Sequence, residues 1–95
     1  LQILEGATVL KLLFDSQNRT KCIGASYEYR GQIYSAMAKK EVILAAGVFD
    51  TPKLLQLSGV GPKQWLDPLG IDLVVNNPHV GTNLADQMAL YTAFE

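Results

Sequence analysis

The pentapeptide "VILAA" at residues 42–46 constrains the fold more than any other stretch of this sequence. It is continuously apolar, whereas a half-solvated strand alternates apolar with polar residues. A run of this kind predicts a strand covered on both faces, as in a parallel sheet between two layers. A chain of 95 residues offers too few other elements to cover both faces. We therefore expect a buried strand that requires further layers of protein around it.

Three shorter strands are predicted before this run, over residues 8–14, 22–30 and 33–38. In the first, Thr8, Leu10, Leu12 and Phe14 are expected on one face, and the second alternates in the same way. The polar stretch "DSQNRT" at 15–20 and the break at 30–32 have the composition of turns. Short strands with tight connections predict an antiparallel meander with one solvated face.

Two short helices are predicted after the apolar run. For the first, Thr51 is a candidate N-cap, Pro52 occupies the first helical position, and Gly59 ends the helix. The second follows residues 61–62 and ends at Gly70, with an apolar stripe formed by Trp65, Leu66 and Leu69. A strand over 71–75 and a loop over 76–87 complete the plan. The predicted fold class is α/β, here as an α+β piece with a meander, one buried parallel strand and two short helices.

The turn after the buried strand is the one place where the residues suggest a ligand. At Ala45, Ala46 and Gly47 the side chains become very small. A backbone or a flat ligand can approach such residues closely, and ligands of open α/β sheets bind at the carboxyl ends of the strands. The alternative is that small residues only allow the following helix to fold back on the strand. The residues alone leave both interpretations open.

The other residues of the sequence mostly exclude classes of function. A net charge of −1 gives no basic surface for nucleic acid, and no apolar run approaches the ~20 residues that span a membrane. One cysteine, Cys22, and one histidine, His79, do not suffice for a Cys/His metal site. His79 is interpreted as an exposed or locally hydrogen-bonded loop residue, and Asn83 and Asp86 as organisers of that loop. We assign no catalytic and no metal-binding residue.

Two further features bear on the origin of the chain. Asn18, Arg19 and Thr20 form an N-x-Thr acceptor pattern for N-glycosylation in a predicted exposed turn, which favours a secreted glycoprotein. The sequence begins with "LQILEG" and ends with "MALYTAFE", both strand-like and apolar. Free-standing domains usually begin and end on exposed segments, so we expect an internal piece of a longer protein.

The stretch "GVFDTPKLLQLSGVG" at 47–61 resembles the second signature of the glucose-methanol-choline (GMC) family of FAD-dependent oxidoreductases. Val48 stands where that family usually has a small residue or proline. The segments "VGTNLADQ" at 80–87 and "LEGATVLKLLF" at 4–14 also resemble family segments, so the resemblance covers nearly the whole chain. It is nearest to the family's secreted fungal sugar and aryl-alcohol oxidoreductases.

The resemblance implies a domain assignment and a cofactor. Residues 1–87 would belong to a Rossmann-like FAD-binding domain, and 88–95 would begin the substrate-binding domain. The cofactor-binding residues it implies are Val9, whose main chain would contact the adenine, together with Ala46 and Gly47. The family's phosphate-binding glycine motif and its proton-accepting histidine would lie outside this sequence. By itself, the chain is therefore expected neither to bind FAD tightly nor to catalyse a reaction.

The function implied is oxidation of an alcohol or sugar hydroxyl by hydride transfer to the flavin, with the rest of a longer polypeptide as partner. One alternative is an FAD-containing lyase or cyclase of the same family. The other is a small α+β binding or structural module without a cofactor. The apolar ends and the buried-type strand argue against that module.

Overall fold

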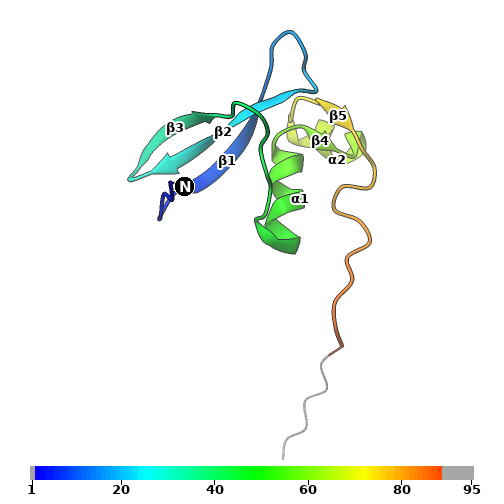
Figure 1. Cartoon of the computed structure of the whole chain (residues 1–95). Helices are drawn as coiled ribbons and strands as arrows, with labels where there is room; N and C mark the ends of the chain where they lie inside the picture. Colours follow the sequence, from blue (N-terminus) through cyan, green and yellow to red (C-terminus); the bar gives the residue numbers. More distant parts are fainter. Residues whose placement is uncertain (1, 89–95) are drawn as a thin grey trace, which may run out of the picture.

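The computed structural model describes residues 2–88. Its largest element is an antiparallel sheet of three strands in the order β1-β2-β3 (Figure 1). The strands are β1 (Thr8–Phe14), β2 (Cys22–Tyr29) and β3 (Gln32–Met37). The predicted meander is therefore confirmed. The turn between β2 and β3 consists of Arg30 and Gly31, which both have positive φ, at 52° and 76°. Two such residues in succession are typical of the tight turns that match the twist of a hairpin.

Strand β1 departs from the even alternation that the sequence predicts. Its pairing with β2 shifts register between Val9 and Lys11, and again between Leu13 and Phe14. Each shift is a bulge or irregularity, which bends the strand and turns its side chains. Leu12, between the two shifts, is buried with 4% of its surface exposed, whereas Thr8 is exposed. The single face predicted for positions 8, 10, 12 and 14 is therefore interrupted.

Residues 42–46 do not form the strand predicted for them. They carry no strand assignment in the structure, and Ile43 is 79% exposed. A parallel strand exists only when neighbouring strands supply hydrogen bonds along its edges. None of residues 2–88 forms such a pair with this segment. The prediction of a buried strand is therefore wrong for the described residues, although the mixed α and β character of the chain is confirmed.

Helix α1 (Gly47–Leu57) begins five residues earlier than predicted. Its N-cap position is Ala46, so Thr51 and Pro52 lie inside the helix. The Thr51 hydroxyl nevertheless has a capping role, because its Oγ1 accepts a hydrogen bond from the Ala46 backbone N–H at 3.0 Å. Thr51 therefore satisfies a backbone donor at the start of α1 from a position in the second turn. The predicted end is confirmed, since Gly59 follows the C-cap residue Ser58 with a left-handed φ of 87°.

A small second unit follows the helix, made of short elements. They are β4 (Val60–Gly61), α2 (Lys63–Leu66), the 3₁₀ helix η1 (Asp67–Leu69) and β5 (Val75–Asn76). Gly70 ends η1 in the left-handed region, as predicted. Strands β4 and β5 pair in parallel. Of the strand predicted over 71–75 only Val75 is in β5, because pairing starts where Val74 and Val75 both donate to the Gly59 carbonyl.

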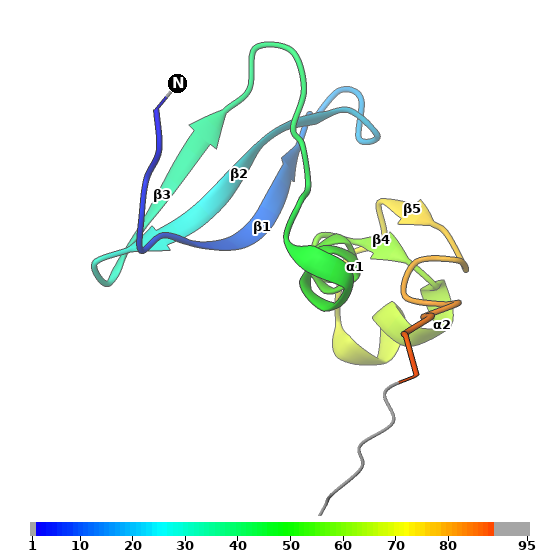
Figure 2. The same cartoon turned by 60° about the horizontal axis from the view of Figure 1, so that its bottom comes forward.

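Helix α1 lies between the three-stranded sheet and this second unit, and Figures 1 and 2 agree on the arrangement. The buried hydrophobic side chains of the described residues are few: Leu12, Leu54 and Leu66. The radius of gyration is 16.8 Å, compared with about 12 Å for a compact domain of this length. Many large apolar side chains remain exposed, among them Ile33, Met37, Ile43, Val48, Phe49, Leu69 and Leu84. The described part of the chain is therefore an open assembly around a small core. No helix among residues 2–88 is long and apolar enough to cross a membrane.

The buried Ser58 hydroxyl connects the sheet to the helix. Ser58 is 1% exposed, and its Oγ accepts a hydrogen bond from the Leu12 backbone N–H at 2.9 Å. The same hydroxyl donates to the Leu54 carbonyl at 2.6 Å. Strand β1 is at the edge of the sheet, so an N–H on its outer side needs an acceptor from another element. Ser58 thus fixes the position of β1 against the end of α1.

We expect Ser58→Ala to lower the free energy of unfolding by about 1–3 kcal/mol, because the buried Leu12 N–H loses its acceptor. Urea unfolding of the protein measures the loss. Ser26→Ala is the matched control, since Ser26 donates an exposed hydrogen bond to the Lys11 carbonyl at 3.3 Å. Its expected effect is within about 0.5 kcal/mol. Equal losses in the two variants would contradict the connecting role of Ser58.

Candidate functional site

A cavity of about 500 Å³ lies where the beginning of β1 meets one side of α1. Pockets of roughly 300–1,000 Å³ are of the size that holds small molecules and cofactors. Residues far apart in the sequence line it: Ala7, Thr8, Val9, Leu10, Ala46, Asp50, Lys53, Leu54 and Leu57. Val9 and Ala46, which the sequence analysis singled out separately, therefore contribute to one cavity. Its wall is mainly aliphatic, with charged side chains only at Asp50 and Lys53.

The main chain beside Val9 is irregular. Val9 pairs with Tyr27, and the next pair along the strand joins Lys11 to Ser26, so Leu10 has no partner residue in β2. Bulges of this kind interrupt the hydrogen-bond ladder and are frequent beside functional sites. The irregularity lies at the cavity wall, because Val9 and Leu10 both line it. Backbone groups released from the ladder can contact a planar, hydrogen-bonding ligand there.

Gly47 lies beside the cavity in sequence but is not among the residues that line it. It is the first residue of α1 and has a left-handed φ of 89°. A Cβ added at Gly47 would meet no heavy atom of the described residues within 4 Å. The left-handed backbone conformation therefore accounts for glycine at this position. Crowding by other residues within 2–88 does not. Of the three predicted cofactor-binding residues, the structure brings Val9 and Ala46 to one cavity and leaves Gly47 at its side.

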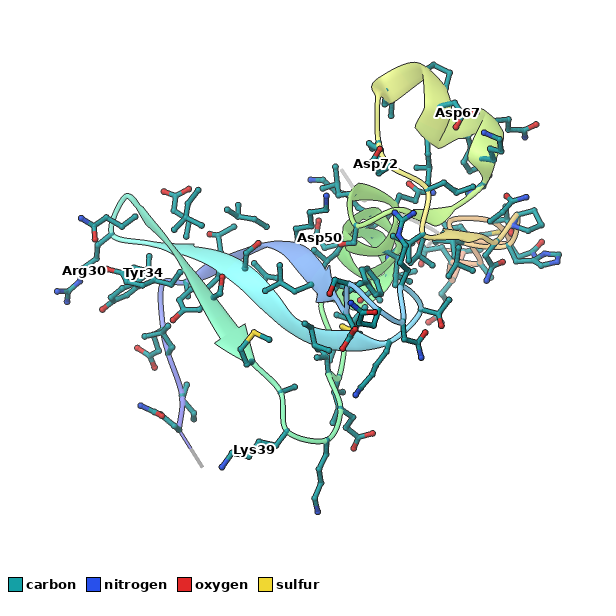
Figure 3. All side chains as sticks on the ribbon, turned by 90° about the horizontal axis from the view of Figure 1, so that it is seen from above. Arg30, Tyr34, Lys39, Asp50, Asp67 and Asp72 are labelled. Atoms are coloured by element: carbon teal, nitrogen blue, oxygen red, sulfur yellow. The ribbon has the colours of Figure 1, made fainter. Side chains whose placement is uncertain are left out.

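The charged groups of the cavity belong to the first turns of α1. Asp50 and Lys53 form an ion pair of 4.0 Å, and their side chains are 71% and 69% exposed. Such a pair contributes little to stability because water screens it. Figure 3 shows Asp50 on the part of α1 next to β1. The pair thus places one acidic and one basic group beside an otherwise aliphatic cavity.

The loop after β5 is organised mainly by its asparagines. His79 is exposed, and its backbone N–H donates to Asn77 Oδ1 at 3.0 Å, which confirms its interpretation as a locally hydrogen-bonded loop residue. Asn83 has a positive φ of 56°, and Asp86 Oδ1 accepts a hydrogen bond from the Gln87 N–H at 2.8 Å. Asp86 therefore makes a local side-chain hydrogen bond, as predicted, whereas Asn83 contributes a left-handed backbone conformation. No group of three or more His, Cys, Asp or Glu side chains that could hold a metal ion occurs within residues 2–88.

Sequence reasoning missed the role of Gln56. This helical side chain donates from Nε2 to the Val80 carbonyl at 3.1 Å, which ties the loop to α1. Gln56 also lies close to Gly81, where an added Cβ would come within 2.7 Å of Nε2. The only signal in the sequence is a polar residue between leucines on a short helix. Such a residue is equally compatible with a solvent-exposed position.

Comparison with known proteins places this arrangement in one family. The family described as GMC oxidoreductase matches residues 1–89. A dehydrogenase of Armillaria gallica is 39% identical over 94 residues, which is 99% of this chain and 15% of that protein. An oxygen-dependent choline dehydrogenase of Chromohalobacter salexigens is 43% identical over 75 residues, covering 79% of this chain and 13% of the relative. The chain belongs to the GMC oxidoreductase family, and it spans about 15% of the length of such relatives.

The fold agrees with this assignment. A solved structure of formate oxidase from Aspergillus oryzae, determined in work on FAD modification, superimposes with a TM-score of 0.77 at 40% sequence identity. The match covers 81% of this chain and 13% of the formate oxidase chain. An FAD-dependent oxidoreductase from Chaetomium thermophilum superimposes with a TM-score of 0.71, also at 40% identity.

Proposed function

We propose that this chain forms part of an FAD-dependent oxidoreductase and that the cavity between β1 and α1 holds the adenine-containing end of FAD. The observation that carries the proposal is that one cavity joins the irregular main chain at Val9 to Ala46. Membership of the GMC family and the likeness to FAD-containing structures support it. The same observations favour an enzyme over a small binding module without a cofactor.

Each residue of the site has a defined task in this proposal. The main chain at Val9 would hydrogen-bond the edge of the adenine, and the small Ala46 side chain would leave room for its ring. Gly47 would allow the turn that leads from Ala46 into α1. Bound FAD supplies a hydride acceptor. The substrate would be an alcohol or sugar hydroxyl, and the groups that remove its proton would lie in parts of the enzyme outside this chain.

The exposed apolar side chains favour a partner that covers them. The side chains of Val48, Phe49 and Leu84 are 60%, 71% and 58% exposed, and they line a common groove. Exposed apolar surface of this extent needs a cover in water. In the proposal, the remainder of the oxidoreductase polypeptide covers it. Residues 42–46 would then gain the neighbouring strands that they lack here. The predicted beginning of the substrate-binding domain, residues 88–95, lies outside the described residues except for Met88.

Ala46→Leu tests the cofactor site. The larger side chain would enter the cavity, and we expect FAD affinity of the full-length protein to fall about tenfold or more. The measurement is a titration of apoprotein with FAD, followed by the visible flavin absorption. Bleaching of that absorption by alcohols and sugars under anaerobic conditions then tests the reaction.

Ala36→Leu is the control for the titration, because Ala36 is exposed on β3 and does not line the cavity. Circular dichroism of both apoproteins confirms that each variant folds. A folded Ala46→Leu variant with unchanged FAD affinity would overturn the placement of the adenine. A full-length protein that binds no flavin would overturn the proposed function as a whole.

A further inference from the structure

The loop that joins β1 to β2, residues 15–21, projects from the molecule at the end of the sheet (Figures 1 and 2). It contains the tripeptide Asn18-Arg19-Thr20, and residues 16–21 are all exposed. Neither the cavity between β1 and α1 nor the groove beside the 81–85 segment includes any of these residues. The proposed oxidoreductase site therefore leaves this loop unexplained.

The loop is held by its own hydrogen bonds. Asp15 Oδ1 accepts the backbone N–H groups of Gln17 and Asn18 at 2.8 and 3.1 Å. The Lys21 N–H donates to the Asn18 carbonyl, and the Asp15 N–H to the Lys21 carbonyl, each at 2.9 Å. The backbone donors of Gln17 and Asn18 hold the pKa of the Asp15 carboxyl below its ordinary value of 3.8. The backbone of the loop therefore favours the carboxylate form of Asp15.

The Asn18 side chain has a defined orientation. Its Oδ1 accepts the Thr20 hydroxyl at 2.9 Å and is 3.4 Å from the Thr20 backbone N–H, which is an Asx-type turn. Because the Thr20 N–H can only donate, Oδ1 must face it and Nδ2 must face away. Nδ2 donates no hydrogen bond to any side chain or backbone group within residues 2–88. The amide nitrogen of Asn18 is thus presented to solvent by its own threonine.

We infer that Asn18 is an acceptor for an N-linked glycan and that the protein passes through the secretory route. In this modification Nδ2 bonds to the anomeric carbon of a lipid diphosphate-linked oligosaccharide. The bond from that carbon to the diphosphate oxygen breaks, the lipid diphosphate leaves, and the amide nitrogen loses one proton. The N-x-Thr pattern is the acceptor sequence of this reaction.

A glycan at Asn18 would lie away from the cavity between β1 and α1. Asp15, directly after β1, is six positions after Val9, which corresponds to about 20 Å at the usual rise of a strand. The neighbours Gln17 and Arg19 are exposed as well, although Arg19 also lines a separate shallow cavity beside Ser58. The modification would therefore add a hydrophilic group at one end of the sheet and leave the cavity accessible. This inference does not depend on FAD binding.

The test uses the full-length protein isolated from its natural source. Peptide-N-glycosidase F in heavy-oxygen water converts a glycosylated asparagine to labelled aspartate, which mass spectrometry detects in the peptide covering 12–19. We expect the label at Asn18. Unlabelled, unmodified Asn18 in this material would overturn the inference.

Variants expressed in the same organism separate the acceptor from its surroundings. Thr20→Ala should abolish the label, whereas Thr20→Ser should retain it because serine keeps the hydroxyl that contacts Asn18. Asn83→Gln is the matched control and should leave the label at Asn18 unchanged. Asn83 is followed by Leu84 and Ala85, so it is not an acceptor. Persistence of the label in Thr20→Ala would contradict the role of this tripeptide.

Discussion

Gly59→Ala is expected to destabilise the protein by about 3 kcal/mol or more, the largest loss among the substitutions considered. Gly59 has a left-handed φ of 87°, which any other L-residue adopts at a cost. A Cβ at this position would also overlap the Asp72 carbonyl oxygen and come within 3.0 Å of Val74 Cγ2. A backbone oxygen cannot move aside as a flexible side chain can. The strain would therefore be transmitted to the chain that enters β5.

The consequence reaches beyond one turn because Gly59 connects three elements. Its N–H donates to the Gln56 carbonyl at the end of α1, and its own carbonyl accepts the N–H groups of Val74 and Val75. A shift here would separate α1 from the β4–β5 pair. We expect a lower thermal midpoint and a reduced yield of folded full-length protein, measured by differential scanning fluorimetry and by size-exclusion chromatography.

Gly70→Ala is the matched control for this prediction. Gly70 has a similar left-handed φ of 66°, but an added Cβ would meet no heavy atom within 4 Å. Its expected cost is that of backbone strain alone, about 1 kcal/mol. The difference between the two variants therefore measures the overlap with residues 72 and 74. If both variants lost the same stability, the close approach at Gly59 would be refuted.

These glycines illustrate what the sequence predicts well. Gly59 and Gly70 end their helices as expected, because each follows an apolar stripe and no other residue adopts the left-handed conformation as easily. The meander is predicted for a similar reason, since alternation and turn residues are local signals. The helix start is predicted five residues too late because Thr51 and Pro52 are strong start signals wherever they stand. That the Thr51 hydroxyl reaches back to Ala46 depends on a helix that already exists.

The candidate site depends on contacts that the sequence does not encode locally. The sequence indicates Val9 only through resemblance to a family, and it indicates Ala46 through the small size of its side chain. That they line one cavity depends on the packing of α1 on β1, which the Ser58 hydroxyl fixes through Leu12. For the predicted strand over 42–46 the sequence signal is clear, but the neighbouring strands are missing from residues 2–88. Its apolar residues indicate a buried environment that the described residues do not supply, since Ile43 is 79% exposed.

Leu66→Ala is expected to produce the second large loss, about 2–5 kcal/mol in the free energy of unfolding. Leu66 is 1% exposed and is the most buried hydrophobic side chain of the described residues. It lies on α2 close to β4, where its Cδ1 is 3.6 Å from the position of a Cβ on Gly61. Its removal would leave a cavity under a unit that has only two-residue strands to hold it. Urea unfolding of the full-length protein measures the loss.

Leu69→Ala separates the effect of burial from the effect of losing a leucine. Leu69 lies three residues later in the adjoining 3₁₀ helix and is 72% exposed. If Leu66 forms the core of this unit, Leu69→Ala should change stability by no more than about 0.5 kcal/mol. Comparable losses would mean that another part of the protein buries Leu69, and the core would then extend beyond Leu66. Because exposed Leu69 and buried Leu66 have the same side chain, the difference between the variants depends on environment alone.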